Sequence, residues 1–242
     1  MSVVVGIFLA WYVVFVFSAT CHEAGHAWAA MRGGDTTAYE GGQVSLDPLP
    51  HIRREPFGMI LVPIASFALI GMSNGWEHAW MLGWASAPYN ASWARRHPRR
   101  HAWMSLAGPA ANFLLAGAAF GILKAMMSAK LVSLPTQFAY TRVLEAPAGN
   151  YGSTLGAVAF VLSLMLILNL LLGLFNLIPF PPLDGASILE GFGPEPVKRL
   201  YVLIREQPMF GIIGLLIAWQ LFPFIWGPVS YVVIRNLLWG LP

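Results

Sequence analysis

The chain has 242 residues, of which 57% are hydrophobic and only 10% are Asp, Glu, Lys or Arg. A soluble domain carries about 25% charged residues, so this composition excludes an ordinary water-soluble globule and a disordered chain. The net charge of +3 is too small to indicate a nucleic-acid-binding protein, and the single cysteine, Cys21, excludes an internal disulfide. The sequence therefore predicts an integral membrane protein.

Five stretches without a charged residue are long enough to enter a bilayer, whose core needs about 20 apolar residues in a helix. They are residues 3–21, 57–76, 102–123, 146–183 and 207–234. The connecting loops are short, so we expect an all-α integral membrane protein: a polytopic helical bundle formed by a single transmembrane domain over residues 1–242. Its core is expected over residues 3–190, with an additional C-terminal helix over residues 207–234.

Basic residues predict the side of the membrane on which each loop lies. Arg53 and Arg54 precede residues 57–76, and Arg95 and Arg96 follow them. Since basic loops favour the cytoplasm, both flanks belong there, and this stretch should re-enter rather than cross. Its proline and glycine residues suit such a broken path. With four full crossings elsewhere, both chain termini are expected outside.

Ionisable residues at the end of the first apolar stretch are the strongest functional signal. An acidic residue at the centre of a span costs about 3 kcal/mol, so a functional role is the default interpretation. His22 and His26 are four residues apart and share one helix face, where two imidazoles can bind one zinc ion. Glu23 lies beside them and can act as general base in this H-E-x-x-H arrangement. The alternative is two histidines with ordinary hydrogen-bond partners and a paired glutamate.

A third metal ligand must come from elsewhere in the chain, because a catalytic zinc ion usually has three protein ligands. Asp184 follows a proline-rich segment with Pro179, Pro181 and Pro182. Prolines break a helix, and irregular backbone at membrane depth is tolerated only where it is buried in protein or faces water. A polar active site would provide such surroundings. The alternative is a helix end that leads into a turn capped by Asp184.

Together these motifs resemble the site-2 protease family of intramembrane zinc metalloproteases. The family pairs H-E-x-x-H with N-x-x-P-x-P-x-L-D-G, and residues 176–185 match the second motif in full register. Residues 105–112 are similar to the family's S-L-A-G-P-x-x-N, and residues 42–52 to the G-x-V-x-L-x-P-x-x-H-I of its compact bacterial members. Residues 83–90 correspond to G-W-A-K-P-V-P-x-N, but Ser86 stands in place of the lysine.

The resemblance implies a compact bacterial enzyme of the inner (plasma) membrane, without a peptide-binding or regulatory domain. It implies one zinc ion per chain, held by His22, His26 and Asp184, with Glu23 as the catalytic base. The expected activity is regulated intramembrane proteolysis, with an active site towards the cytoplasmic side. The partners would be the lipid bilayer and a transmembrane protein substrate, with no nucleic acid.

Two further groups of residues are candidates for handling the substrate. Asn112 and Asn176 carry side-chain amides that can stabilise the oxyanion of the tetrahedral intermediate, with ordinary interhelical hydrogen bonding as the alternative. A modestly alternating stretch is expected to form an exposed strand on the cytoplasmic side. This strand would clamp an unwound substrate by strand addition, and it comprises Gln43, Val44, Ser45 and Leu46.

Two functions without hydrolysis would use the same ligands. One is a zinc carrier, and the other is a catalytically inactive zinc-binding membrane scaffold. A carrier needs polar residues along a path through several helices, whereas the polar groups here gather at one depth. The presence of Glu23 beside the predicted ligands favours hydrolysis over both alternatives.

Overall fold

The computed structural model describes residues 2–135, 142–147, 153–205, 207 and 209–238. Five helices in these ranges are long and apolar enough to cross a membrane, which makes the chain a multi-pass membrane protein. The architecture is all-helical. An isolated antiparallel β-bridge joins Ser133 and Glu145.

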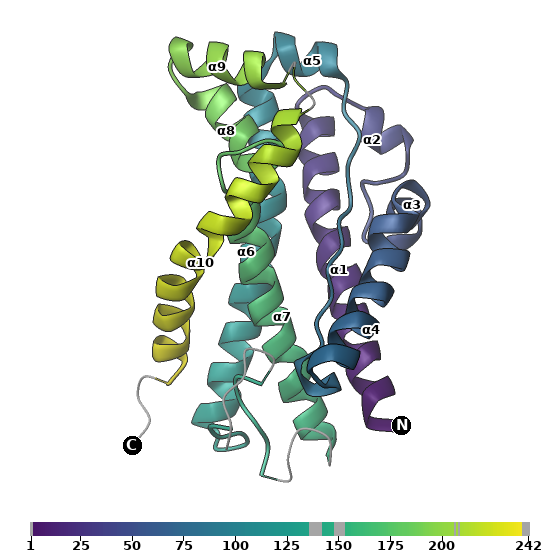
Figure 1. Cartoon of the computed structure of the whole chain (residues 1–242), viewed down its shortest axis with the longest axis vertical. Helices are drawn as coiled ribbons and strands as arrows, with labels where there is room; N and C mark the ends of the chain where they lie inside the picture. The colour runs from purple at the N-terminus through teal and green to yellow at the C-terminus, as the bar shows by residue number, and fades with distance from the viewer. Residues whose placement is uncertain (1, 136–141, 148–152, 206, 208, 239–242) are drawn as a thin grey trace.

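The long helices form an elongated bundle (Figure 1). They are α1 (Ser2–Arg32), α4 (Val62–Asn74), α6 (Pro98–Ser128), α7 (Thr154–Asn176) and α10 (Met209–Leu238). The start of α1 and the end of α10 lie at one end of the bundle, and most of the shorter helices gather towards the other end. The shorter helices are α2 (Thr37–Glu40), α3 (Pro48–Arg54), α5 (Ala91–Arg96), α8 (Asp184–Phe192) and α9 (Glu195–Arg205).

Helices α1, α6 and α7 pack closely because small residues lie where they meet. A Cβ atom on Gly25 of α1 would lie 2.8 Å from the backbone oxygen of Ala107 in α6. A Cβ atom on Gly173 of α7 would lie 2.8 Å from the ring of Phe113 in α6. Small residues at helix interfaces are typical of membrane bundles, where backbones must approach closely to gain packing energy. The close approach places the polar end of α1 directly against α6.

Residues 57–90 run along α1 and return. A π-helical turn, η1 (Phe57–Leu61), leads into α4, which descends towards the end of the bundle where α1 begins (Figure 1). After a 3-10 turn, η2 (Trp76–His78), residues 79–90 rise in extended form to α5. The length and hydropathy of this excursion also suit a full crossing, so its predicted re-entry into the bilayer stays a prediction.

The predicted strand over Gln43, Val44, Ser45 and Leu46 is not formed, and residues 44–46 lie in a bend. The side chain of Gln43 is buried and donates a hydrogen bond to the backbone carbonyl of Ser86 at 3.0 Å. The Ser45 hydroxyl accepts a hydrogen bond from the backbone N–H of Asp47 at 3.0 Å. Such side-chain bonds to the backbone compete with strand pairing, and here they turn the chain into α3.

Helix α10 is the least embedded of the long helices, and most of its large apolar side chains are exposed on the isolated chain. It begins at Met209 and ends at Leu238, close to the predicted range of 207–234. Its first turns pack on the proline-rich segment, because Gly214 lies directly against the backbone of Pro181. The start of α10 therefore covers the segment that leads to Asp184.

Candidate metal centre

A cavity of about 410 Å³ lies in the half of the bundle that carries α8 and α9. Its walls come from α1, α6, the extended segment before α5, the α7–α8 turn and the start of α10. The lining therefore combines residues from nearly the whole length of the chain. Its polar members include His22, Glu23, His26, Ser105, Asn176 and Asp184.

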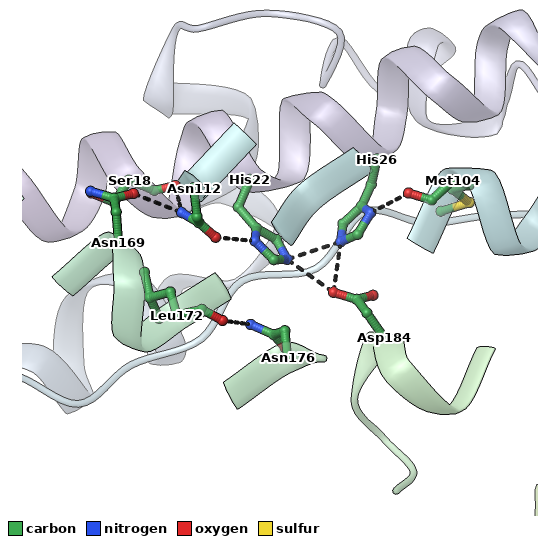
Figure 2. Close-up of polar contacts among 9 residues, drawn as sticks. All are labelled: Ser18, His22, His26, Met104, Asn112, Asn169, Leu172, Asn176 and Asp184. Carbon is green, nitrogen blue, oxygen red and sulfur yellow. Dashed lines mark hydrogen bonds and ion pairs between the residues drawn. The ribbon is translucent and has the colours of Figure 1, made fainter. Parts of the chain in front are cut away.

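The three predicted metal ligands meet in this cavity. His22 and His26 stand one helical turn apart on α1, with their Nε2 atoms 2.9 Å from each other. The Oδ2 atom of Asp184 lies 3.2 Å from Nε2 of His22 and 3.3 Å from Nε2 of His26. Figure 2 shows both rings and the carboxylate pointing towards one another from α1 and from the first residue of α8.

Asp184 reaches the histidines because the chain turns sharply between α7 and α8. The proline-rich segment ends α7, and the hydroxyl of Tyr201 in α9 donates a hydrogen bond to the backbone carbonyl of Pro179 at 2.7 Å. Burial raises the pKa of Tyr201, so this hydroxyl stays a donor at neutral pH. Gly185 lies so close to the carbonyls of the turn that only a residue without a Cβ fits, and α8 therefore starts directly against the end of α7.

Hydrogen bonds determine which ring nitrogen of each histidine faces the cavity. Nδ1 of His26 lies 2.7 Å from the backbone oxygen of Met104, which can only accept, so Nδ1 carries the hydrogen. Nδ1 of His22 lies 2.5 Å from Oδ1 of Asn112 and donates to it in the same way. Both Nε2 atoms therefore present a lone pair towards Asp184.

This donor set fits zinc. Two imidazole lone pairs and a carboxylate oxygen, all within 3.3 Å of one another, repel unless a cation lies among them. Two histidines and one carboxylate form a ligand set of catalytic zinc sites, which leave a further position for water. Glu23 is also near, since one ligand atom each of His22, Glu23 and His26 lie within 4.8 Å of one another. Asp184 is the carboxylate that contacts both histidines, which leaves Glu23 free for another task.

The two asparagines of the sequence prediction lie in different surroundings. Asn176 lines the cavity, and its Nδ2 atom donates to the backbone carbonyl of Leu172 at 3.0 Å. Asn112 is completely buried in α6, and its amide faces His22 rather than the cavity. The position of Asn112 therefore suits orientation of a ligand, whereas Asn176 can still reach a substrate.

The stretch predicted to clamp the substrate also lies elsewhere. Val44, Ser45 and Leu46 line a separate apolar hollow on another face of α1, together with Cys21 and Trp28. The extended chain beside the metal centre is instead the segment before α5, whose residues 85–87 line the cavity. The prediction placed the extended element on the wrong part of the chain, because a short alternating pattern does not show which segment lies beside the site.

Sequence reasoning missed two polar residues behind the metal centre, Ser18 and Asn169. Both are fully buried, and Asn169 contacts the amide of Asn112. Each lies inside an otherwise apolar span, and this is the signal that could have found them, because polar side chains are costly there without a partner.

Comparisons with known proteins identify the family. The sequence profile of Peptidase family M50 matches residues 10–201. The chain belongs to this family, the site-2 proteases. The resemblance inferred from the motifs is thereby confirmed, and it extends over most of the chain. No solved structure matches.

The curated relatives carry related names. "Putative zinc metalloprotease YwhC" of Bacillus subtilis (strain 168) is 32% identical over 206 residues, which cover 85% of this chain and 77% of the relative. "Putative zinc metalloprotease Rip2" of Mycolicibacterium smegmatis is 29% identical over 217 residues, covering 88% of this chain and 69% of the relative. The Mycobacterium tuberculosis H37Rv protein of the same name is 26% identical over 227 residues, covering 94% and 74%. Together with the five apolar helices, these likenesses support a protease of the membrane.

Proposed function

We propose that this family M50 protein is an intramembrane zinc metalloprotease that hydrolyses peptide bonds in or near transmembrane segments of other proteins. The observation that carries the proposal is the convergence of two histidine Nε2 atoms and the Asp184 carboxylate at 2.9–3.3 Å, with Glu23 beside them in the cavity. His22, His26 and Asp184 would hold one zinc ion per chain. The relatives' names as zinc metalloproteases agree with this donor set.

When bound, zinc supplies a Lewis acid that polarises the scissile carbonyl and brings the pKa of the attacking water to about 7. The Glu23 carboxylate takes a proton from that water as its oxygen adds to the carbonyl carbon. Glu23 then delivers the proton to the leaving nitrogen as the C–N bond breaks, so one water is consumed for each bond cut. Glu23 is 6% exposed and lines the cavity, where it is sheltered from bulk solvent.

Asn176 is the side-chain amide placed to stabilise the oxyanion of the tetrahedral intermediate. It lines the same cavity as Glu23 and Asp184 and belongs to the end of α7. A preorganised amide at this position would add to the electrostatic stabilisation that the metal provides. Asn112 is assigned instead to His22, because its amide is buried and already engaged there.

A substrate must be extended before its backbone reaches the metal. Residues 85–87 run in extended form along the cavity, and Ala85 and Ala87 carry small side chains that leave room for another chain. Addition of a substrate strand to this segment would hold the peptide beside Glu23 by main-chain hydrogen bonds. Gln43 supports the segment by its bond to the Ser86 carbonyl, so the stretch predicted as the clamp acts from behind it.

The active site belongs to the cytoplasmic side of the bilayer. The end of the bundle near the cavity carries Arg95 and Arg96 on α5 and Lys198 and Arg199 on α9, and basic residues favour the cytoplasm. Both termini then lie outside, and the excursion over residues 57–90 enters and returns. For a bacterial relative of this family, the membrane is the inner (plasma) membrane. Within the cell, the activity would be regulated intramembrane proteolysis.

The test separates a protease from an inactive scaffold or a zinc carrier. Wild type, Asp184→Ala, Glu23→Gln and the control Glu195→Gln, an exposed glutamate of α9, are purified, and bound zinc is measured by elemental analysis. We expect about one zinc per chain, lost only in Asp184→Ala. Membranes of cells expressing each variant are then compared for new protein N-termini by mass spectrometry.

Loss of a general base costs about 10²–10⁴ in rate, so new N-termini should vanish in Glu23→Gln and persist in Glu195→Gln. Zinc bound in Glu23→Gln together with unchanged N-termini would reject hydrolysis in favour of the scaffold or carrier. An unchanged zinc content in Asp184→Ala would reject Asp184 as the third zinc ligand.

A further inference from the structure

A chain of buried polar side chains leads from the metal centre into the apolar core. Oδ1 of Asn112 contacts Nδ1 of His22 at 2.5 Å, and Nδ2 of Asn112 donates to Oδ1 of Asn169 at 2.8 Å. Nδ2 of Asn169 donates to the hydroxyl of Ser18 at 2.9 Å and to the backbone oxygen of Met165 at 2.9 Å. Figure 2 shows this chain crossing from α1 through α6 to α7.

The direction of every hydrogen bond in this chain follows from its far end. The backbone carbonyl of Met165 can only accept, so the NH₂ group of Asn169 must face it. The oxygen of Asn169 then faces Asn112 and requires the NH₂ group of that residue. The oxygen of Asn112 is left for Nδ1 of His22, which must carry the hydrogen, and the lone pair at Nε2 is free for a metal.

We propose that Asn169, supported by Ser18, is a positioning residue of the metal site that holds His22 in the tautomer and orientation required to bind zinc. It acts through Asn112 and contacts neither the cavity nor a reacting atom. The proposal rests on the zinc site of the proposed function. It adds a residue of α7 to that site, whereas the proposed zinc ligands come from α1 and α8.

The burial of these polar side chains supports a specific role at the metal site over ordinary interhelical hydrogen bonding. Ser18, Asn112 and Asn169 are each 0% exposed, and their hydrogen bonds lie where α1, α6 and α7 meet. Without Asn169, the NH₂ group of Asn112 keeps, among the described residues, only a long contact of 3.5 Å to the backbone carbonyl of Ser18, so the amide can rotate and turn this group towards His22. Nδ1 of His22 would then accept, Nε2 would carry the hydrogen, and the metal would lose a ligand. Partners that orient a metal-binding histidine in this way typically contribute a factor of about 10–100 to metal affinity.

The experiment is a double-mutant cycle on zinc affinity. Asn169→Leu, Asn112→Leu and the double variant are prepared in the full-length protein, and the zinc dissociation constant is measured by competition with a chromogenic chelator. The control is Ser163→Ala, another fully buried polar residue of α7, whose hydroxyl donates to the backbone carbonyl of Ala159 in its own helix and, within the described part of the chain, to no residue of another helix. Circular dichroism and gel filtration of the metal-free proteins show whether each variant is folded.

We expect Asn169→Leu to weaken zinc binding by about 10–100-fold and Ser163→Ala to leave it unchanged. Adding Asn169→Leu to Asn112→Leu should cause little further loss, because both residues act on His22 through one chain. Ser18→Ala, which removes one oxygen atom, tests the same chain in a variant that keeps both amides, and should weaken zinc binding several-fold.

Wild-type zinc affinity in folded Asn169→Leu or Ser18→Ala would overturn the proposal, and so would additive losses in the double variant. A merely structural role for Asn169 would lower thermal stability without changing the zinc dissociation constant. These outcomes leave the proposed function intact if Asp184→Ala still loses its zinc. Absence of zinc from the wild type would instead reject the metal site itself.

Discussion

Substitution of Gly108 by alanine tests the packing of the metal centre most directly. Gly108 lies on α6 against the two histidines, and a Cβ atom there would lie 2.6 Å from Nε2 of His22 and still closer to Nε2 of His26. Ordinary van der Waals contact begins at 3.4 Å. One methyl group would therefore press on both atoms that are proposed to bind zinc.

The size of the effect follows from the distances. To accept the methyl group, the His22 ring must shift by about 0.8 Å, whereas a metal–ligand distance tolerates only about 0.2 Å. The rings cannot simply retreat, because Asn112 and the Met104 carbonyl hold their Nδ1 atoms at 2.5 and 2.7 Å. Overpacking of this kind costs about 1–3 kcal/mol, so we expect zinc binding to weaken by about 5- to 150-fold.

The assay compares Gly108→Ala with Gly117→Ala on the same helix. A Cβ on Gly117 would meet no atom within 4 Å, so this control carries the same change of helix propensity without the collision. Zinc content and the zinc dissociation constant are measured for both variants in detergent. Wild-type zinc affinity in folded Gly108→Ala would refute the close packing of α6 on the histidines and with it the geometry of the proposed site.

Three other outcomes are expected. A chelator should abolish cleavage. Added zinc should restore it, whereas added magnesium should not. Activity that survives removal of the metal would contradict a metalloprotease. Gln43→Leu should raise KM several-fold and leave zinc affinity unchanged, because the Gln43 side chain holds the Ser86 carbonyl of the extended segment beside the cavity. An unchanged KM would contradict this supporting role of Gln43. Burial raises the pKa of Asp35, but hydrogen bonds from Thr37 and Asn90 outweigh it and hold the pKa below the ordinary 3.8. The stabilisation by Asp35 is therefore present at neutral pH and lost as pH falls through the lowered pKa. The difference in Tm between wild type and Asp35→Asn should shrink in acid. A difference in Tm that stays constant with pH would contradict this reasoning.

Much of the metal centre was predictable because its geometry is local. Residues four apart on a helix share a face, so His22 and His26 had to stand together once the first helix was extended beyond residues 3–21 through the apolar residues up to Met31. Asp184 was identified from the proline-rich segment before it, since broken backbone in a membrane protein needs polar surroundings. The number and approximate bounds of the long helices followed from stretches without charge, and the structure contains a helix for each.

The partners of side chains across helices were decided only by the tertiary structure. Whether Asn112 faces the cavity or His22 depends on the rotation of α6 against α1, which is set by contacts such as that of Gly25 with Ala107. The extended chain beside the site proved to be residues 85–87 rather than 43–46, because a weak alternating pattern carries no information about neighbours. Local periodicity thus determined which residues share a helix face, and only helix packing determined what each face meets.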